Sequence, residues 1–263
     1  MDLKLRGKRA LVFGASRGLG YATARGLAIE GVQLAINSRY VENIEKAAQR
    51  ISDEVEVDVA PIPGDLSDPL SPVEVTQIAA EKLGGLDILV TNSGGPPAGD
   101  FENFQDEDWI KAVDINFLSH VRSIRAALPH LRQSGSASVL TITSYSVKQP
   151  IPHLVLSNSI RSATVGLTKT LALELGGDGI RFNSILPGWT KTERVYELMT
   201  HRAKMNDTTL EEEFSKQAKE SPFKRMAELE EFANAAVFLV SPAASYITGV
   251  MLAVDGGMYK GIL

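Results

Sequence analysis

Short apolar runs alternate with longer amphipathic stretches along the whole chain. The short runs predict strands at residues 11–13, 32–36, 55–60, 86–90, 139–143, 181–186 and 251–254. The longer stretches place apolar residues three and four positions apart, and they predict helices at 21–30, 41–51, 69–83, 107–132, 157–175 and 228–240, with a charged helical stretch at 193–220. Strands that alternate with helices indicate one α/β domain, in which helices cover both faces of a parallel sheet.

The carboxyl ends of the predicted strands are rich in small and polar residues. These ends carry Gly14, Asn37, Asp65, Asn92, Ser144 and Pro187-Gly188. In parallel sheets of this kind, ligands bind in the crevice beyond the carboxyl ends of the strands. Turn chemistry explains any one of these ends, but it explains the whole set poorly. The pattern therefore predicts a nucleotide site at this edge of the sheet.

The first strand runs directly into a turn that contains three glycines. Gly14, Gly18 and Gly20 have the spacing Gly-x3-Gly-x-Gly and lead into a predicted helix. Glycine lets a ligand approach the backbone without meeting a Cβ, and the N-terminus of a helix suits a phosphate. The spacing differs from the Gly-x-Gly-x2-Gly dinucleotide fingerprint, and a plain strand-to-helix turn is the alternative. The strand before the turn and the helix after it favour phosphate binding.

Composition and charge narrow the classes of function. The chain has 263 residues, of which 44% are hydrophobic, so it can bury a full core. It has no cysteine, which excludes disulfides, thiolate metal sites and a cysteine nucleophile, and we expect no metal centre. Its formal net charge of −5 is spread over both signs and predicts no surface for nucleic acid or membrane. No apolar signal or membrane-spanning run is present, so we expect a cytoplasmic protein that binds small molecules or copies of itself.

The motifs resemble, in order and spacing, those of the short-chain dehydrogenase/reductases, and the β-ketoacyl-acyl-carrier-protein reductase branch is the nearest. The resemblance covers residues 1–263 and is carried by Gly14-x3-Gly18-x-Gly20, Asp65-Leu66, Asn92-Ser93-Gly94, Asn116, Ser144, Pro187-Gly188-x3-Thr192 and Val254-Asp255-Gly256-Gly257. It implies a single Rossmann-like, doubly wound domain with a seven-stranded parallel sheet of order 3-2-1-4-5-6-7. It also implies a substrate lid at 193–220. Helices near 107 and 157 would pair in a homodimer, and residues 255–263 would complete a homotetramer.

The end of the second predicted strand bears on the choice of cofactor. An NAD enzyme places a carboxylate there for the ribose 2′-hydroxyl, whereas this chain has Asn37-Ser38-Arg39. Arg39 and Arg17 suit a 2′-phosphate instead, and two ordinary surface arginines are the alternative. We therefore expect NADP(H) rather than NAD(H). The resemblance places the cofactor contacts at Gly14, Ser16, Arg17, Gly18, Leu19, Gly20, Ser38, Arg39, Asp65, Leu66, Asn92, Ser93, Gly94, Pro187, Gly188, Thr190 and Thr192.

The resemblance also implies four catalytic positions, and two of them lack the family's residue. The family uses an Asn, a Ser, a Tyr and a Lys for hydride transfer to a carbonyl. Asn116 and Ser144 match the first two, but Ser157 and Arg161 occupy the Tyr and Lys positions. A serine hydroxyl is a far weaker acid than a phenol, whose reference pKa is about 10, and a guanidinium stays protonated. We therefore expect cofactor binding to survive better than chemistry.

Other residues near Ser144 in the sequence are candidates for the missing proton donor. His153, Tyr145 and Lys148 follow Ser144 closely, and the histidine is the natural choice because its reference pKa is near 6.5. The alternatives are an exposed loop histidine and a packed tyrosine. Water held between the hydroxyls and the guanidinium of the catalytic positions is a further candidate. Trp189 either faces the nicotinamide or plugs the core.

Two functions from different classes stay open. The first is an NADP(H)-dependent oxidoreductase that reduces a carbonyl or oxidises an alcohol. Apolar residues within 193–220 hint at a hydrophobic or acyl-like substrate, such as a 3-oxoacyl thioester. The second is an NADP(H)-binding protein with little or no redox activity, which acts as a partner or sensor. The full set of motifs favours the enzyme, whereas Ser157 and Arg161 favour the binding protein.

Overall fold

A parallel sheet lies at the centre of the computed structural model, which describes residues 1–262. Its strands are β1 (Arg9–Val12), β2 (Gln33–Ser38), β3 (Val59–Pro63), β4 (Ile88–Thr91), β5 (Ser138–Ile142), β6 (Arg181–Pro187) and β7 (Met251–Val254). They are hydrogen-bonded in the order β3-β2-β1-β4-β5-β6-β7, and each neighbouring pair is parallel. The predicted doubly wound sheet and its strand order are confirmed.

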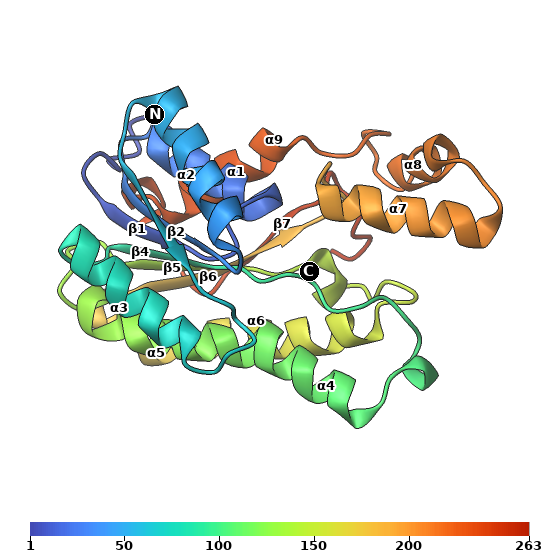
Figure 1. The fold of residues 1–263 in the computed structure, drawn as a ribbon, viewed down its shortest axis with the longest axis horizontal. Coiled ribbons are helices and arrows are strands. Elements are labelled where there is room, and N and C mark those ends of the chain that lie inside the picture. The colour runs from blue at the N-terminus through green and yellow to red at the C-terminus, as the bar shows by residue number, and fades with distance from the viewer. Residues whose placement is uncertain (263) are drawn as a thin grey trace.

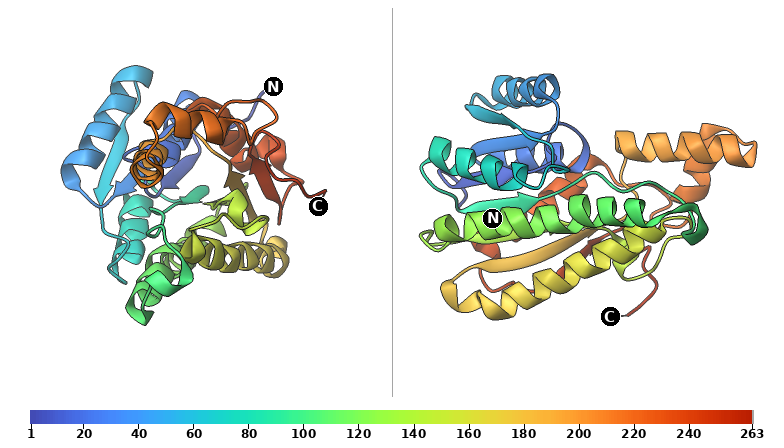
Figure 2. Two further views of the ribbon diagram at one scale, coloured as in Figure 1. Left: turned by 90° about the vertical axis from the view of Figure 1, so that its right-hand side faces the viewer. Right: turned by 60° about the horizontal axis from the view of Figure 1, so that its bottom comes forward.

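Helices cover both faces of this sheet (Figure 1). One face carries α1 (Gly18–Ile29), α2 (Val41–Val55) and α9 (Leu229–Val240). The other side carries α3 (Ser71–Leu83), α4 (Asp106–Val113), α5 (Ser119–Leu131) and α6 (Val155–Glu174). Two further helices, α7 (Glu193–Asn206) and α8 (Leu210–Ala218), project beyond the sheet at one end of the molecule (Figure 2). Single helical turns lie at Phe101–Asn103, Asp114–Leu118, Tyr145–Val147, Gly176–Asp178 and Pro242–Ala244.

Neighbouring residues of a central strand enter different cores. In β1, Ala10 and Val12 pack in the cluster that includes residues of α1 and α9, whereas Leu11 packs with residues of α3 and α5. Strand side chains alternate between the two faces, and here both faces are covered by helices. Full burial of a side chain such as Leu11 or Val12 stabilises the fold by roughly 1.5–3 kcal/mol. This double burial is why the central strands are uninterrupted apolar runs in the sequence.

The third strand begins at Val59, so the prediction that it spans 55–60 is wrong at its start. Val55 is the last residue of α2, and Glu56 ends that helix with a left-handed φ of 55°. Val55 stands four residues after the buried Ile51, so it extends the apolar face of the helix. Val55 also stands an even number of residues before Val59, so it fits the period of two that is typical of a strand. The helical contact prevails because α2 continues to pack on the core through Val55.

The stretch predicted as one helix at 107–132 is interrupted by a π-helical turn. This turn, Asp114–Leu118, separates α4 from α5 and contains the buried Asn116. The backbone carbonyl of Asn116 accepts a hydrogen bond from Thr164 Oγ1 on α6, at 3.1 Å. Such turns occur frequently at functional sites. The other predicted elements lie at their predicted places, with ends that differ by a few residues.

A buried carboxylate joins the amino end of β1 to the amino end of β4. Asp87 accepts hydrogen bonds from the backbone N and from Nε of Arg9, both at 2.9 Å, and from Ser134 Oγ at 2.6 Å. Burial opposes the charged form, but the hydrogen bonds from Arg9 and Ser134 outweigh it and lower the pKa of Asp87 from its ordinary 3.8 to about 2. The ionised carboxyl therefore stabilises the folded state.

We expect the stability that Asp87 supplies to disappear as the pH falls from about 4 toward 2. A carboxyl with a lowered folded-state pKa stabilises the fold above its unfolded pKa, and this contribution is lost as the pH falls through the folded value. The shift corresponds to about 2–3 kcal/mol. Urea unfolding of the protein and of Asp87→Asn measures it, because their difference in unfolding free energy should shrink between pH 5 and pH 2.5. Asp58→Asn, at an exposed position, is measured alongside for comparison, and a constant Asp87→Asn difference would contradict this account.

Candidate active site

A cleft of about 1010 Å³ lies beyond the carboxyl ends of the strands. Most of the residues predicted to bind the cofactor or to act in catalysis line it, namely Gly14, Ser16, Arg17, Gly18, Leu19, Ser38, Arg39, Asp65, Leu66, Asn92, Ser93, Gly94, Ser144, Ser157, Arg161, Pro187, Gly188, Thr190 and Thr192. Gly20 and Asn116 do not line the cleft but support residues that do. The fold thus gathers positions from the whole chain at one edge of the sheet.

The glycine turn after β1 packs too closely on the end of β4 to hold side chains. A Cβ on Gly14 would lie 2.7 Å from Asn92 Nδ2, and a Cβ on Gly20 would lie 2.3 Å from the carbonyl oxygen of Gly14. Asn92 Nδ2 donates a hydrogen bond to that same oxygen at 3.1 Å. Gly14 and Gly18 both have a φ of 59°, which favours glycine. Close packing therefore requires glycine at positions 14 and 20, whereas at Gly18, whose Cβ would meet no atom closer than 3.7 Å, the backbone conformation favours it.

The N-terminus of α1 opens into the cleft next to the glycine turn. No side chain caps it, and no acidic residue stands in its first turn. Residues 16–19 line the cleft there. The first backbone N–H groups of a helix have no partner within the helix, and together with the helix dipole they attract a phosphate. This end of the cleft therefore fits the phosphates of a dinucleotide.

Basic side chains gather where the cleft passes the end of β2. Arg39, Lys46 and Arg50 line this part. Arg39 Nε lies 4.0 Å from Asp65 Oδ2, and the Arg39 guanidinium lies 4.4 Å from the ring centroid of Tyr40. Sequence analysis missed Lys46 and Arg50, although they stand four residues apart on one face of the helix after β2. Their charges suit a 2′-phosphate at this end of the cleft.

Ser157 and Arg161 lie on one face of the first turns of α6. Arg161 Nε donates a hydrogen bond to Ser157 Oγ at 3.2 Å, and Nη1 donates to the backbone carbonyls of Thr143 at 3.2 Å and Ile142 at 3.4 Å. Burial, and then the charge of Arg194, lower the pKa of Arg161 to about 10, so it stays protonated at neutral pH. The guanidinium is thus anchored to the end of β5, and the Ser157 hydroxyl keeps its proton free to donate.

Ser144 and Tyr145 lie just after β5, beyond Thr143, and both line the cleft. Ser144 Oγ accepts a hydrogen bond from the backbone N of Ser146 at 3.1 Å, which leaves its own proton free. Tyr145 packs with Trp189 in an apolar cluster beneath α7. Burial, and then the charge of Glu220, raise the pKa of Tyr145 to about 12. The tyrosine that the structure places in the cleft is therefore a weaker acid than a free phenol.

Two of the candidate proton donors lie outside the wall of the cleft. His153 is exposed, and its Nδ1 lies 2.9 Å from Asp100 Oδ1. Lys148 Nζ lies 5.2 Å from the ring centroid of Tyr259. Neither residue is among those that line the cleft. Nearness to Ser144 in the sequence did not place these two side chains in the wall of the cleft, although Ile151 and Leu154 of the same stretch line it.

A buried polar network that sequence analysis missed stands behind the cleft. His120 Nε2 lies 3.4 Å from Ser93 Oγ, which accepts a hydrogen bond from Asn116 Nδ2 at 2.8 Å. Asn116 Nδ2 also donates to the carbonyl of Gly94 at 2.6 Å. Burial, and then the charge of Arg161, lower the pKa of His120 to about 3, so its ring is neutral. The network fixes the loop after β4, and a lone histidine on a helix gave no signal of it.

The helices α7 and α8 form a hairpin whose first half faces the cleft. Thr192 Oγ1 caps α7 by accepting a hydrogen bond from the backbone N of Val195 at 3.2 Å. Arg17 Nη1 donates to Glu197 Oε1 at 3.2 Å, and Arg194 Nη2 donates to the carbonyl of Pro96 at 3.3 Å. The predicted helical stretch at 193–220 is therefore a helix pair, and α7 touches both the glycine turn and the loop after β4.

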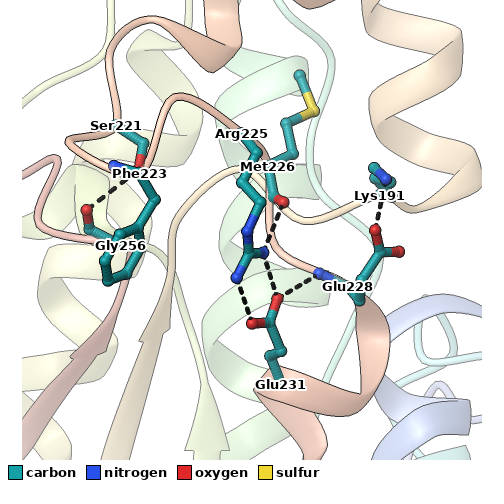
Figure 3. A network of polar contacts seen from close by, with 8 residues as sticks. All are labelled: Lys191, Ser221, Phe223, Arg225, Met226, Glu228, Glu231 and Gly256. Carbon is teal, nitrogen blue, oxygen red and sulfur yellow. Dashed lines mark hydrogen bonds and ion pairs between the residues drawn. The ribbon is translucent and has the colours of Figure 1, made fainter.

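The two ends of this hairpin are fastened beside each other (Figure 3). Lys191, just before α7, forms an ion pair with Glu228 at the start of α9. Arg225 forms an ion pair with Glu231 at 2.6 Å and donates to the carbonyl of Met226. These contacts hold the segment before α7 and the segment after α8 next to the start of α9. Between them, Ser221 Oγ after α8 donates a hydrogen bond to the carbonyl of Gly256 beyond β7, at 3.1 Å, so the hairpin is fastened there as well.

The described part of the chain, residues 1–262, has no group of three or more His, Cys, Asp or Glu residues that could hold a metal ion. Within the same residues, no helix is both long and apolar enough to cross a membrane.

Comparisons with known proteins agree with this geometry. Residues 14–259 match the family described as enoyl-(acyl carrier protein) reductase. The NADPH-dependent reductase BacG of Bacillus subtilis is 30% identical, and the match covers 97% of this chain and 99% of that protein. L-sorbose reductase from Gluconobacter frateurii, solved with NADPH and L-sorbose, has a TM-score of 0.95 and 32% identity over the full length of both chains.

A third comparison is with another enzyme solved with NADPH. A short-chain oxidoreductase from Pseudomonas aeruginosa PAO1, solved with NADPH and described as containing an atypical catalytic center, has a TM-score of 0.88 and 27% identity over 97% of each chain. The family match, the near-complete coverage of these relatives and the shared fold all agree. The chain belongs to the short-chain dehydrogenase/reductase family.

Proposed function

We propose that the chain is an NADP(H)-dependent oxidoreductase that acts on a small carbonyl compound or alcohol. The cleft carries the proposal, because it combines a phosphate-binding turn, a basic end and a cluster of hydroxyl and guanidinium donors. The relatives support it, since BacG is named an NADPH-dependent reductase and the L-sorbose reductase was solved with NADPH. The alternative, a cofactor-binding protein without redox activity, finds no support among these relatives.

The residues present fit NADP(H). The glycine turn and the N-terminus of α1 would hold the pyrophosphate, and Arg17, Arg39, Lys46 and Arg50 would face the 2′-phosphate. The remaining predicted contacts line the cleft as well, with Asp65 and Leu66 for the adenine, residues 92–94 for a ribose and residues 187–192 for the nicotinamide end. When bound, NADPH supplies a hydride for the carbonyl carbon.

In this proposal the chain's own groups stabilise the charge that develops on the carbonyl oxygen. Ser144 and Ser157 donate hydrogen bonds to this oxygen, since each hydroxyl has its proton free. Arg161 adds a fixed positive charge beside Ser157. Neither serine is the net source of the proton, so the H⁺ consumed in the reduction comes from the solvent, and a serine hydroxyl that passes its proton to the oxygen regains one from there. Asn116 acts behind them by holding the loop after β4.

The proposal includes a mobile part and an assembly. The hairpin of α7 and α8, within residues 193–220, would serve as a substrate lid, and its clustered attachment points support this role. Assembly as a homodimer or homotetramer stays a prediction, as does a cytoplasmic location. Exposed apolar side chains support assembly, because Ile110 on α4 is 63% exposed and Leu173 on α6 is 76% exposed.

NADPH oxidation over a panel of ketones, aldehydes and oxo acids tests the proposal. We expect the protein to consume NADPH with at least one compound and to bind NADPH at least tenfold more tightly than NADH. We expect the Ser157→Tyr/Arg161→Lys double variant to reduce neutral ketones at least tenfold faster, because a phenol is a better proton donor than a serine. Thermal unfolding checks that the variant is folded.

The other outcomes of this panel are equally informative. Tight NADPH binding without turnover by the protein, together with activity in the double variant, would make the cofactor-binding alternative correct. Failure of the protein to bind NADPH would contradict both functions. Turnover by the protein that the double substitution abolishes would show that Ser157 and Arg161 form a working site of their own.

A further inference from the structure

Arg161 is a buried positive charge that the chain does not neutralise. Its side chain is 9% exposed, and its hydrogen bonds go to two backbone carbonyls and one serine hydroxyl, which are all uncharged acceptors. Among residues 1–262, no carboxylate oxygen lies within 4.0 Å of its guanidinium. A buried charge is costly unless an opposite charge compensates it. The site is therefore built to receive a negative charge.

The unused edge of this guanidinium faces the cleft. Both N–H groups of Arg161 Nη2 lack a hydrogen-bond acceptor within the described residues, whereas Nε and Nη1 have theirs. A Cβ on Gly95 would lie 3.8 Å from Nη2, and both residues line the cleft. A glycine at this position leaves open space beside Nη2. An anion in the cleft can therefore reach the free edge of Arg161.

A second guanidinium stands in the same part of the cleft. Arg194 reaches over from α7 and donates from Nη2 to the carbonyl of Pro96, the residue after Gly95. After burial, the charge of Arg194 is the second cause that lowers the pKa of Arg161, so the two cations repel each other. Glu197 lies 3.7 Å from Arg194 Nη1 but leaves Arg161 without a partner. An anion between the two guanidinium groups would relieve their repulsion.

A bound dinucleotide does not supply this negative charge. Its ribose hydroxyls accept hydrogen bonds but are neutral, so they leave the charge of Arg161 uncompensated. Its phosphates would have the glycine turn, the N-terminus of α1 and the basic side chains near β2 as partners. The substrate is the remaining molecule that enters the cleft beside Ser157 and Arg161.

We propose that the substrate is a carbonyl compound with a carboxylate one or two carbons from the carbonyl, and that Arg161 and Arg194 bind this carboxylate. This inference rests on the proposed function. The carboxylate must be close to the carbonyl, because Arg161 is hydrogen-bonded to the hydroxyl that faces the carbonyl oxygen. Arg161 donates to the carboxylate from Nη2, and Arg194 adds a second positive charge, so the two side chains together also fix the orientation of the carbonyl.

The reaction balances with groups already named. The carbonyl carbon would gain the hydride of NADPH, which becomes NADP⁺, the carbonyl oxygen would gain one H⁺ drawn from the solvent, and the carbonyl double bond would become a single bond. The carboxylate keeps its charge throughout and takes no part in the bond changes. Its role is to bind and orient the substrate.

Matched acids and esters test the inference. The compounds are 2-oxobutanoate and acetoacetate, each compared with its methyl ester. We expect kcat/KM for at least one acid to exceed that of its ester by tenfold or more, and the acid with the larger ratio identifies the spacing of the two groups. In Arg194→Gln this ratio should fall at least fivefold. Lys204→Gln, which removes an exposed positive charge from the same helix, should leave the ratio unchanged.

A binding measurement separates the inference from the proposed function. Oxamate, a carboxylate that cannot be reduced, is titrated by calorimetry into the complex of the protein with NADP⁺, with oxamide as the uncharged control. We expect oxamate to bind, oxamide to fail, and Arg194→Gln to weaken oxamate binding at least fivefold.

Each contrary result has a distinct meaning. Turnover of acids and esters at equal rates overturns the inference and leaves the oxidoreductase in place. Absence of all turnover contradicts the proposed function, and oxamate binding then decides the anion site by itself. If Arg194→Gln weakens NADPH binding as much as it lowers acid turnover, Arg194 serves the cofactor phosphates and the inference is wrong.

Discussion

The Gly20→Ala variant is expected to lose NADPH binding and part of its stability. An added Cβ would lie 2.3 Å from the carbonyl oxygen of Gly14 and 2.8 Å from Asn92 Nδ2, so α1 has to move away from the turn. Overpacking of this kind lowers the free energy of unfolding by about 1–3 kcal/mol. The movement also misplaces the backbone N–H groups that would hold the pyrophosphate, and each hydrogen bond to a charged group contributes about 1.5–3 kcal/mol. Loss of two such bonds raises the Kd for NADPH about 100-fold or more.

Fluorescence titration with NADPH and urea unfolding measure the two effects. Gly135→Ala is the matched control, because its Cβ would meet no atom within 4 Å and the residue lies in an exposed turn. We expect this control to keep both the NADPH affinity and the unfolding free energy, the latter within about 0.5 kcal/mol. Unchanged NADPH binding in Gly20→Ala would show that the glycine turn is not the phosphate site.

Ser144→Ala is expected to lower kcat about 100- to 1000-fold while the NADPH affinity stays the same. Removal of one hydrogen-bond donor to a developing oxyanion has an effect of this size. The hydroxyl also accepts the hydrogen bond that caps the turn Tyr145–Val147, so we expect a further loss of about 0.5–2 kcal/mol in unfolding free energy. Steady-state kinetics with the best compound of the panel, together with urea unfolding, separate the two effects.

Ser146→Ala is the control for this substitution. Ser146 is buried two residues away, its hydroxyl has no hydrogen-bond partner among the described residues, and it does not line the cleft. Its kcat should therefore stay near that of the unchanged protein. If Ser144→Ala also keeps its kcat, the oxyanion is stabilised elsewhere, and Arg161 becomes the first residue to replace.

The fold was predictable because its signals are local. Each central strand is a buried apolar run, and each strand end carries small or polar residues, so the order of elements and the edge that holds the cleft follow from the sequence together with the family motifs. The prediction that Val55 begins a strand was wrong because the position of Val55 fits both the helical and the strand period. The π-helical turn around Asn116 depends on its contact with Thr164, which lies 48 residues away in the sequence.

The charges of the site were less predictable than its glycines. Glycines at a fixed spacing between a strand and a helix have few roles other than a tight turn. Lys46 and Arg50, in contrast, are equally typical of a solvent-exposed helix face and of a phosphate site. The pairing of Arg17 with Glu197 spans 180 residues and depends on where the hairpin folds back. The sequence marked Ser157 and Arg161 as replaced positions, but only the structure places the free edge of Arg161 in the cleft beside Gly95.

Because of the ion pair between Arg17 and Glu197, we expect the rate of NADPH binding to depend on ionic strength. Both side chains are more than half exposed, at 61% and 51%, so dissolved ions screen their attraction. The same ions screen the attraction between the basic end of the cleft and an incoming 2′-phosphate. Added salt thus loosens the contact that holds α7 over the glycine turn, and it also slows the approach of the nucleotide. Because these two effects oppose each other, we expect the rate of NADPH loading to fall less steeply with added salt than attraction of the nucleotide alone would give.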